Sequence, residues 1–179
     1  MTDAMTREIM ETDVVIVGAG PAGLAAAITL RKAAPDLSVI VVEKSAEIGG
    51  HILSGAVMDP AGLDALIPDW REKGAPVGPE VNEDRFVYLT ENSAIPFPDM
   101  LIPPIMKTEG GVIVSLGALC GWLAGEAEAL GVDVFPGTAA ADLVRGENGE
   151  ILGIVTGDLG VARDGTPKST FAAGIELRA

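Results

Sequence analysis

Residues 13–43 read DVVIVGAGPAGLAAAITLRKAAPDLSVIVVE, and this stretch decides the fold. Val14–Val17 is a short β-branched run of the kind that forms a strand buried on both faces. A glycine-rich turn follows without a gap, and the composition of Leu24–Lys32 predicts a helix. A second apolar run, Val39–Val42, predicts another strand. The stretch therefore forms a βαβ unit, in which the two strands lie parallel in one sheet.

The turn between the first strand and the helix has the spacing Gly-x-Gly-x-x-Gly. We expect Gly18 to permit the tight turn, Gly20 to let the backbone approach a pyrophosphate, and Gly23 to let the helix pack closely on the strand. The pyrophosphate would lie at the helix N-terminus, where free N–H groups and the helix dipole favour an anion. Glu43 ends the second strand about 20 residues later, where a carboxylate meets ribose hydroxyls. Together these features predict a dinucleotide-binding site.

The residues after the second strand indicate which dinucleotide is bound. The carboxylate of Glu43 would repel the 2′-phosphate of NADP, which leaves NAD or FAD. Lys44 and then Gly49–His51 follow. Here the stretch resembles the large class of flavoproteins with an N-terminal FAD domain, in which Glu-Lys/Arg…Gly-Gly comes after the second strand. We therefore expect FAD.

His51 is the only histidine and lies in a loop of small and apolar residues, 49–60. Glycines in such a loop would let the backbone pass near a flat ligand. On its own chemistry, His51 is most simply interpreted as a loop histidine that is hydrogen-bonded to backbone. A lone histidine does not make a metal site, so we expect no metal here.

The composition of the chain limits its partners. The 179 residues include 12 basic and 26 acidic side chains, which give a net charge of −14. This surplus argues against nucleic acid and against an anionic membrane surface as electrostatic partners. It leaves apolar contact with a membrane open.

The compartment is indicated by cysteine usage and by the first residues. Cys120 is the only cysteine, which rules out a disulfide framework or a cysteine-held iron–sulfur cluster within this chain and fits a reducing compartment. Residues 1–12 are polar and contain acids, unlike a secretory signal or a transit peptide. No apolar run approaches the roughly 20 residues of a membrane-spanning helix. We expect a bacterial, cytoplasmic-facing protein.

The middle of the chain departs from the βαβ pattern. Pro60–Trp70 predicts a short helix with a one-sided apolar stripe that belongs to a core. Gly74–Arg85 predicts a loop, and Phe86–Leu89 a strand. Ile95–Met106 is apolar but carries four prolines, so it is neither a regular helix nor a central strand. It either lies buried beneath a lid or forms an exposed apolar patch, and composition alone favours burial.

The last third returns to regular elements. Ser115–Leu130 predicts a helix that stops at Gly131, and Cys120 lies beside its apolar face, where packing explains the thiol better than nucleophilic chemistry. Val132–Phe135 predicts a strand. The tail alternates strands and turns as a β-meander, with strands expected at Ala141–Arg145, Ile151–Thr156 and Gly174–Arg178 and turns at 146–150 and around Asp164.

Over residues 13–179 the chain resembles the electron transfer flavoprotein:ubiquinone oxidoreductase family, and looks like its N-terminal portion. The stretches that carry the resemblance are VVIVGAGPAGLAAA, GGHILSGAVMDP, PDWREKGAP, EDRFVYLT, SLGALCGWLAGEAEALGVDVFPG and GDLGVARDGTPKSTFAAGIELRA. Many flavoproteins share the glycine fingerprint, whereas GGHILSGAVMDP and GVARDGTPKSTF are far more specific to this family.

The resemblance implies an enzyme on the cytoplasmic face of a bacterial membrane, monotopic, that takes electrons from reduced electron transfer flavoprotein and delivers them to ubiquinone. FAD and a [4Fe–4S] cluster would carry the chemistry, and the sequence offers no general base or nucleophile. The cluster ligands and the complete quinone site have no counterpart in this chain, so we expect it to be inactive alone. The alternatives are a geranylgeranyl-reductase-like flavoenzyme and a non-catalytic nucleotide-binding module.

The resemblance also implies which residues contact the cofactor and the membrane. Glu43, followed by Lys44, would bind the ribose, and the apolar stretches Leu63–Trp70 and Ile95–Met106 would contribute to the membrane surface or the quinone channel. The residues expected at the pyrophosphate are Gly18, Gly20, Ala22 and Gly23. Those expected toward the flavin are Gly50, His51, Ser54, Gly55 and Ala56.

The fold class expected is α/β, a Rossmann-like FAD-binding domain of the two-dinucleotide-binding flavoprotein type with an inserted excursion and an appended β-meander. Residues 1–58 would form the FAD-binding βαβ half and residues 59–106 the excursion toward the quinone and the membrane. Residues 107–179 would return to the FAD domain and add the meander, ending before the last strand of the sheet.

Overall fold

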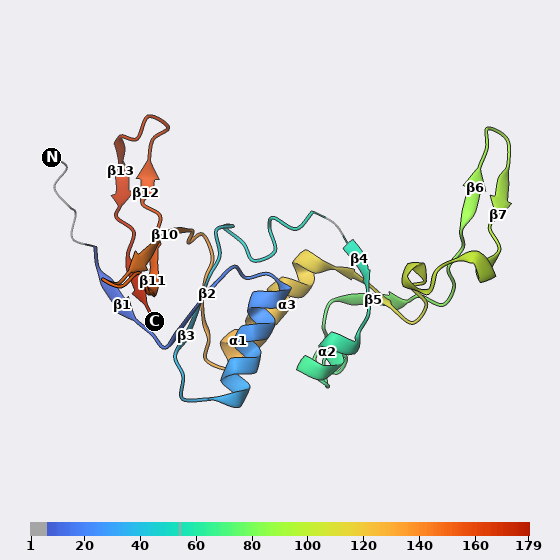
Figure 1. Cartoon of the computed structure of the whole chain (residues 1–179), viewed down its shortest axis with the longest axis horizontal. Helices are drawn as coiled ribbons and strands as arrows, with labels where there is room; N and C mark the ends of the chain where they lie inside the picture. The colour runs from blue at the N-terminus through green and yellow to red at the C-terminus, as the bar shows by residue number, and fades with distance from the viewer. Residues whose placement is uncertain (1–6, 54) are drawn as a thin grey trace. The chain divides into compact units, whose positions relative to one another are not determined.

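The computed structural model of this chain describes residues 7–53 and 55–179 (Figure 1). The chain divides into two compact units. The first unit combines Met1–Ile52 with Cys120–Ala179, and the second is Leu53–Leu119. Both are built from strands with few helices, and each is described by itself.

The first unit contains the expected βαβ arrangement. Strands β2 (Val14–Val17), β3 (Val39–Val42) and β9 (Asp133–Phe135) form a parallel sheet in the order β2-β3-β9. Helix α1 (Pro21–Ala33) connects β2 to β3 and buries Leu24, Ala27 and Ile28. The helix begins three residues earlier than expected because proline is well suited to the first helical position.

Strand β2 corrects one expectation, since it is not buried on both faces. Val14–Ile16 are half-buried and Val17 is 58% exposed, whereas all four residues of β3 are buried. The reason is the position in the sheet. β3 pairs with a strand on each side, but β2 lies at the edge and pairs only with β3 among the described strands.

A second, mostly antiparallel sheet completes the first unit. Its strands are β1 (Ile9–Glu11), β14 (Glu176–Arg178), β11 (Ile151–Thr156) and β10 (Ala140–Arg145), in that order. Buried Ile154 and Leu177 of this sheet pack with Ile40 and Val42 of β3. The two sheets therefore share one apolar core.

The expected β-meander is only partly correct. β10 and β11 form the predicted hairpin, but β12 (Leu159–Val161) and β13 (Pro167–Ala172) pair with each other in a separate two-stranded sheet. The chain then returns, and β14 lies beside β11 and pairs in parallel with β1, a strand that the sequence did not predict. Arg7 makes this return possible, because its guanidinium donates to Asp158 (2.6 Å) before the separate hairpin and to the Gly174 carbonyl (2.9 Å) after it.

The second unit is organised around a three-stranded antiparallel sheet in the order β4-β8-β5. Its strands are β4 (Gly55–Met58), β8 (Val112–Ser115) and β5 (Val77–Glu80). The last of these corrects the loop expected over Gly74–Arg85. Its sequence, VGPE, contains glycine and proline, which hide a strand signal but are tolerated at an edge.

Helix α2 (Ala61–Leu66) is shorter than the expected Pro60–Trp70. Pro68 explains the early end, because the residue before a proline, here Ile67, is pushed out of the helical region. The apolar stripe is nevertheless buried as expected, at Leu63, Ile67 and Trp70. The indole N–H of Trp70 donates to Asp64 (2.7 Å), which holds the turn beneath the helix.

The proline-rich segment of the second unit is exposed, which overturns the burial that composition favoured. Strands β6 (Val87–Leu89) and β7 (Ala94–Pro96) form a hairpin, and two single-turn 3₁₀ helices follow, η1 (Asp99–Leu101) and η2 (Pro104–Met106). Ile102 is the one apolar residue of the segment that is buried. A two-stranded hairpin has no second layer to cover it, so its apolar side chains remain in contact with solvent.

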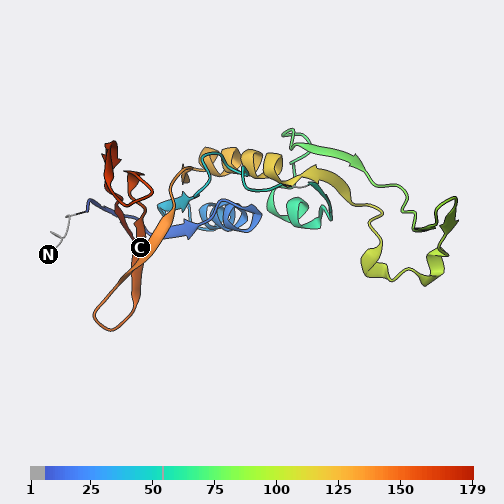
Figure 2. The ribbon, with the colours of Figure 1, turned by 90° about the horizontal axis from the view of Figure 1, so that it is seen from above.

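Helix α3 (Leu116–Ala129) confirms the helix expected over Ser115–Leu130 and is the long gold helix of Figure 2. Leu119, Leu123 and Ala127 are buried. The helix stops where expected, at Gly131, whose φ of +82° suits a glycine. Arg31 at the end of α1 donates from Nε to the Leu130 carbonyl (2.8 Å) and so ties the two helix ends together.

Candidate nucleotide-binding site

The glycine turn after β2 has the geometry that its sequence predicts. Gly18 adopts a φ of +103°, and its N–H donates to the Val42 carbonyl of the neighbouring strand (2.8 Å). A Cβ on Gly23 would lie 2.0 Å from the Gly18 carbonyl oxygen, so only glycine lets the helix approach the turn this closely. A Cβ on Gly20 would meet no atom within 4 Å. The backbone at Gly20 is therefore open to a ligand.

The N-terminus of α1 points from this turn without a side-chain cap. Gly20 is the N-cap residue and Pro21 occupies the first helical position, so the next N–H groups belong to Ala22 and Gly23. Uncapped N–H groups at the positive end of a helix dipole bind anions. Arg31 and Lys32 lie in the last turn, where positive charge suits the opposite end of the dipole.

The carboxylate of Glu43 lies against the glycine turn. One oxygen accepts a hydrogen bond from the Ala19 N–H (3.0 Å), and the other accepts one from the Ser45 N–H (2.8 Å). These two bonds fix the carboxylate at the end of β3, beside the turn that would hold a pyrophosphate. Its remaining lone pairs can accept from ribose hydroxyls.

A cavity of about 240 Å³ lies beside Gly18 and Glu43. Its walls come from the ends of β2 and β3 and from the connection between β9 and β10. The lining residues are Val17, Gly18, Val42, Glu43, Lys44, Thr138, Ala139 and Ala140. This is the crevice beyond the carboxyl ends of parallel strands where open α/β sheets bind nucleotides.

Residues Thr138–Ala140 were missed by the sequence interpretation, which assigned no role to the residues between the strand at Val132–Phe135 and the tail. The Thr138 N–H donates to the Glu43 carbonyl (2.8 Å), and the Gly137 N–H donates to the Ser45 carbonyl (2.7 Å). These bonds bring the connection against the residues that follow β3. Small residues directly after the third parallel strand were the available signal, because all such connections meet at one edge of the sheet.

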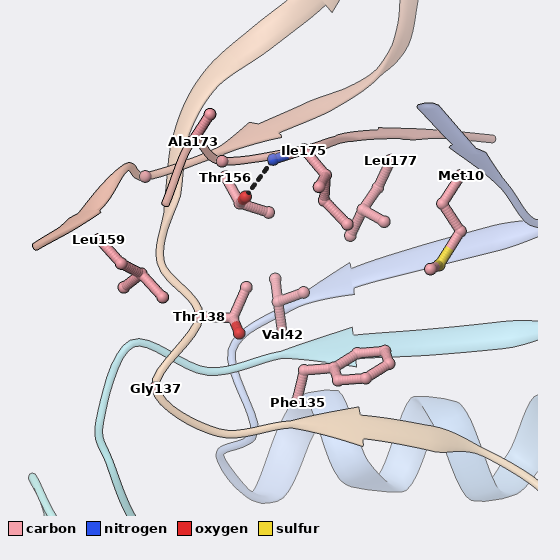
Figure 3. Close-up of a pocket in the computed structure, with 12 residues that line it drawn as sticks. Met10, Val42, Phe135, Gly137, Thr138, Thr156, Leu159, Ala173, Ile175 and Leu177 are labelled. Atoms are coloured by element: carbon pink, nitrogen blue, oxygen red, sulfur yellow. Dashed lines mark hydrogen bonds between the residues drawn. The ribbon is translucent and has the colours of Figure 1, made fainter. Parts of the chain in front are cut away.

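Figure 3 shows a second cavity in the same unit, of about 200 Å³, between the two sheets. Side chains of Met10, Val42, Phe135 and Leu177 line it, and no lining residue is charged. The Thr156 hydroxyl accepts from the Ile175 N–H (2.8 Å), which satisfies the one buried hydroxyl on that side. The cavity is a gap in the apolar core and does not suit the phosphates of a nucleotide.

The residues expected toward the flavin divide between the two units. Gly50 and His51 lie in the turn after β3, where a Cβ on Gly50 would meet the Ser45 hydroxyl at 2.6 Å. His51 is exposed, and its ring makes no hydrogen bond to another described residue, so the interpretation of a loop histidine bonded to backbone is wrong. Gly55 and Ala56 begin β4 in the second unit, and Ser54 lies outside the described residues. The structure thus brings Gly18 together with Glu43 and Lys44 at one cavity. The position of the flavin-side residues at a ligand stays a prediction.

Cys120 is fully buried on α3. Burial raises the pKa of its thiol, and the negative charge of Glu43 adds to the effect. A thiol held protonated in this way is a poor nucleophile, which agrees with the packing role expected from the sequence.

Comparison with solved structures identifies the fold. A geranylgeranyl bacteriochlorophyll reductase-like protein from Thermoplasma acidophilum matches with a TM-score of 0.64 and 22% identity, over 96% of this chain and 38% of that one. The flavin-dependent monooxygenase PieE, crystallised with FAD and substrate, matches with a TM-score of 0.63 and 16% identity, over 95% and 29%. These likenesses show the fold alone. The Thi4 family model matches residues 1–61. The fold is therefore the Rossmann-like one that these FAD-dependent flavoenzymes share.

Sequence relatives make this more particular. The chain is 52% identical to the electron transfer flavoprotein-ubiquinone oxidoreductase of Pseudomonas aeruginosa over 181 residues, which cover 98% of this chain and 33% of that protein. It is also 52% identical to the mitochondrial protein of the same name from Rattus norvegicus, over 98% of this chain and 29% of the relative. The resemblance found in the sequence is confirmed: the chain corresponds to a partial segment, about a third, of these oxidoreductases.

Proposed function

We propose that this chain is the FAD-binding part of an oxidoreductase that passes electrons from reduced electron transfer flavoprotein to ubiquinone. The observation that carries the proposal is the site at the ends of β2 and β3. There Gly18 of the glycine turn and the fixed carboxylate of Glu43 line one cavity, and the uncapped helix α1 begins directly after the turn. The names of the relatives supply the electron donor and acceptor.

The residues present fit FAD. The N–H groups at the start of α1 would hold the pyrophosphate, with Gly18, Gly20, Ala22 and Gly23 around it. Glu43 would accept from the ribose hydroxyls, and Lys44 and Ala139–Ala140 would line the adenosine side of the cavity. FAD supplies the electron-accepting and electron-donating chemistry when bound, and the protein sets its position and surroundings.

Gly50, His51, Ser54, Gly55 and Ala56 would lie toward the flavin ring. The proposal for these five residues rests on the GGHILSGAVMDP loop. The division into an FAD-binding half at residues 1–58, an excursion at 59–106 and a return at 107–179 belongs to the same proposal. A [4Fe–4S] cluster would be held by parts of the protein other than this segment, which carries only Cys120.

We further propose that the proline-rich segment of the second unit meets a bacterial membrane on its cytoplasmic face. We call its exposed apolar side chains the hairpin surface: Val87, Tyr88, Leu89, Ile95, Phe97, Met100, Leu101, Ile105 and Met106. Large exposed apolar patches mark contact surfaces for membranes or partners, and ubiquinone is an apolar acceptor. Among the described residues, no helix is long and apolar enough to cross a bilayer.

The experiment that tests the function follows the flavin in the full-length protein. The purified protein should show a flavin absorbance spectrum, which reduced electron transfer flavoprotein bleaches and a soluble ubiquinone analogue restores. Gly20→Val, which fills the open side of the turn, should remove the flavin and both responses. Protein that carries NAD, or no nucleotide, would contradict the proposal.

A further inference from the structure

We propose that the hairpin surface docks on an electrically neutral lipid bilayer by apolar contact alone, and that anionic lipid weakens this contact. The inference rests on the proposed membrane role of the segment and adds the chemistry of the lipid that it selects. It comes from the charged side chains around the hairpin surface, where each basic side chain is bound to an acidic one.

The apolar side chains of the hairpin surface are strongly exposed. Met100 is 88% exposed and Ile105 is 94% exposed, on two adjacent single-turn helices. Tyr88 and Leu89 are exposed on the neighbouring hairpin. Figure 1 shows β6 and β7 as a separate ribbon that projects beyond the β4-β8-β5 sheet of the same unit. Protruding side chains of this kind enter a fluid apolar phase, whereas a folded protein partner would need a groove matched to each one.

Both basic side chains of this segment are paired with acids of the segment itself. Residues 83–109 contain five acidic and two basic side chains. Arg85 is held by Glu83 through two hydrogen bonds (2.8 and 3.1 Å), and Lys107 donates to Asp99 (2.6 Å). A further acid of the segment, Asp84, accepts a hydrogen bond from the Thr108 hydroxyl (2.7 Å). Both cations are therefore neutralised within the segment, and a net negative charge remains.

The pairing of both cations determines which headgroup charge the surface favours. Surfaces that bind anionic membranes present clusters of lysine and arginine, and each such charge strengthens binding by about fivefold. Here the surplus has the opposite sign, in a chain whose net charge is −14. The negative segment would be repelled by anionic headgroups within a Debye length. At zwitterionic headgroups no such repulsion counteracts the burial of the apolar side chains.

Flotation of the full-length protein with vesicles tests the inference. Phosphatidylcholine vesicles should carry the protein, and replacement of part of the phosphatidylcholine by phosphatidylglycerol should weaken binding severalfold at low salt. Salt of about 1 M, where the Debye length is roughly 3 Å, should restore it. Asp99→Asn, which releases Lys107 and removes one acid, should tighten binding to the anionic vesicles by about fivefold or more and leave binding to the neutral ones unchanged. Glu147→Gln removes an acid from an exposed turn of the first unit and is the matched control.

The outcomes separate the two proposals. A double substitution, Met100→Ser with Ile105→Ser, should weaken binding to neutral vesicles by at least about tenfold. Tighter binding of the parent to anionic vesicles would leave the membrane role intact and overturn the lipid preference. No binding to either kind of vesicle would overturn the membrane role itself. Loss of binding to electron transfer flavoprotein in the double variant, with vesicle binding unchanged, would assign the surface to a protein partner and overturn both.

Discussion

Glu43 illustrates how much one side chain contributes at this site. Its two carboxylate oxygens accept N–H groups from Ala19 in the glycine turn and from Ser45 after β3. The same carboxylate is the group that would bind the ribose. The carboxylate holds the turn in place, and in the proposed function it would also contact the ligand.

Glu43→Arg in the full-length protein should weaken FAD retention. The substitution removes a charge-assisted hydrogen bond worth about 1.5–3 kcal/mol, together with the acceptor for the Ala19 N–H. Flavin absorbance relative to protein after gel filtration measures the loss. Equal flavin occupancy in the variant and the parent would refute the ribose assignment, and Glu147→Gln controls for removal of a remote charge.

Gly23 provides a second test at the scale of the residue. Gly23→Ala places a methyl group 2.0 Å from the Gly18 carbonyl oxygen, so the turn or the helix must move, at about 1–3 kcal/mol. We expect a lower midpoint of thermal unfolding and loss of flavin. Gly125→Ala in α3 is the control, because nothing lies within 4 Å and alanine favours a helix by about 0.5–1 kcal/mol. A Gly23→Ala protein as stable and as yellow as the parent would show that the helix does not need this close approach.

At the scale of the element, the return of β14 to the second sheet depends on a small polar cluster. Asp158 lies just before the β12–β13 hairpin and accepts from Arg7 (2.6 Å) and from the Gly174 N–H (2.8 Å). Three chain segments far apart in sequence meet at this carboxylate. These bonds, first that from Arg7, hold the pKa of Asp158 below its ordinary value of 3.8.

The lowered pKa of Asp158 determines how the stability of the fold changes with pH. The contribution of Asp158 to stability is fully present above the pKa of the unfolded chain and is lost as the pH falls through the lower pKa of the folded state. Asp158→Asn should therefore be less stable than the parent at neutral pH, and the difference should shrink below pH 3.8. Urea unfolding at both pH values measures it, with Asp36→Asn in an exposed loop as the control. A difference that stays constant with pH would refute the account.

The hairpin surface gives a prediction for two neighbouring residues. Leu101 is 60% exposed, whereas Ile102 beside it is 8% exposed. Leu101→Ser in the full-length protein should release it from vesicles without loss of stability or flavin. Ile102→Ser should instead destabilise the fold by about 2–4 kcal/mol, because it removes a buried side chain. Equal loss of stability in both variants, measured by thermal unfolding, would show that the segment is covered in the whole protein.

At the scale of the whole molecule, the described chain leaves apolar groups without cover. β2 lies at the edge of its sheet, and Val17 at its end is exposed beside the candidate site. The chain also spans only about a third of the length of the curated relatives it matches. A flavin domain with an open strand edge is prone to association, since unpaired backbone groups can accept another strand.

We accordingly predict that residues 1–179, produced alone, bind FAD weakly or not at all, tend to aggregate, and do not reduce a ubiquinone analogue. Gel filtration with absorbance detection reports the first two properties and a quinone assay the third, with the full-length protein as reference. A yellow, monodisperse 179-residue protein with quinone reductase activity would overturn this prediction.

The sequence by itself determined the βαβ unit, the tight turn at Gly18, the close approach at Gly23, the helices α1 and α3, and the position of Glu43 at the end of β3. Each of these depends on contacts within about 30 residues and on side chains with strong local preferences. The limits of α2 were also set locally, at Pro68, although the longer apolar stripe hid them.

Tertiary structure alone decided the rest. The wall of the cavity at Thr138–Ala140 is placed by backbone hydrogen bonds to residues more than 90 positions away, which no local pattern specifies. Pairing of β14 with β1 depends on Arg7, Asp158 and Gly174, which come from three parts of the chain. The exposure of Met100 and Ile105 was likewise invisible in composition, because an apolar residue is buried only when another layer of the fold lies over it.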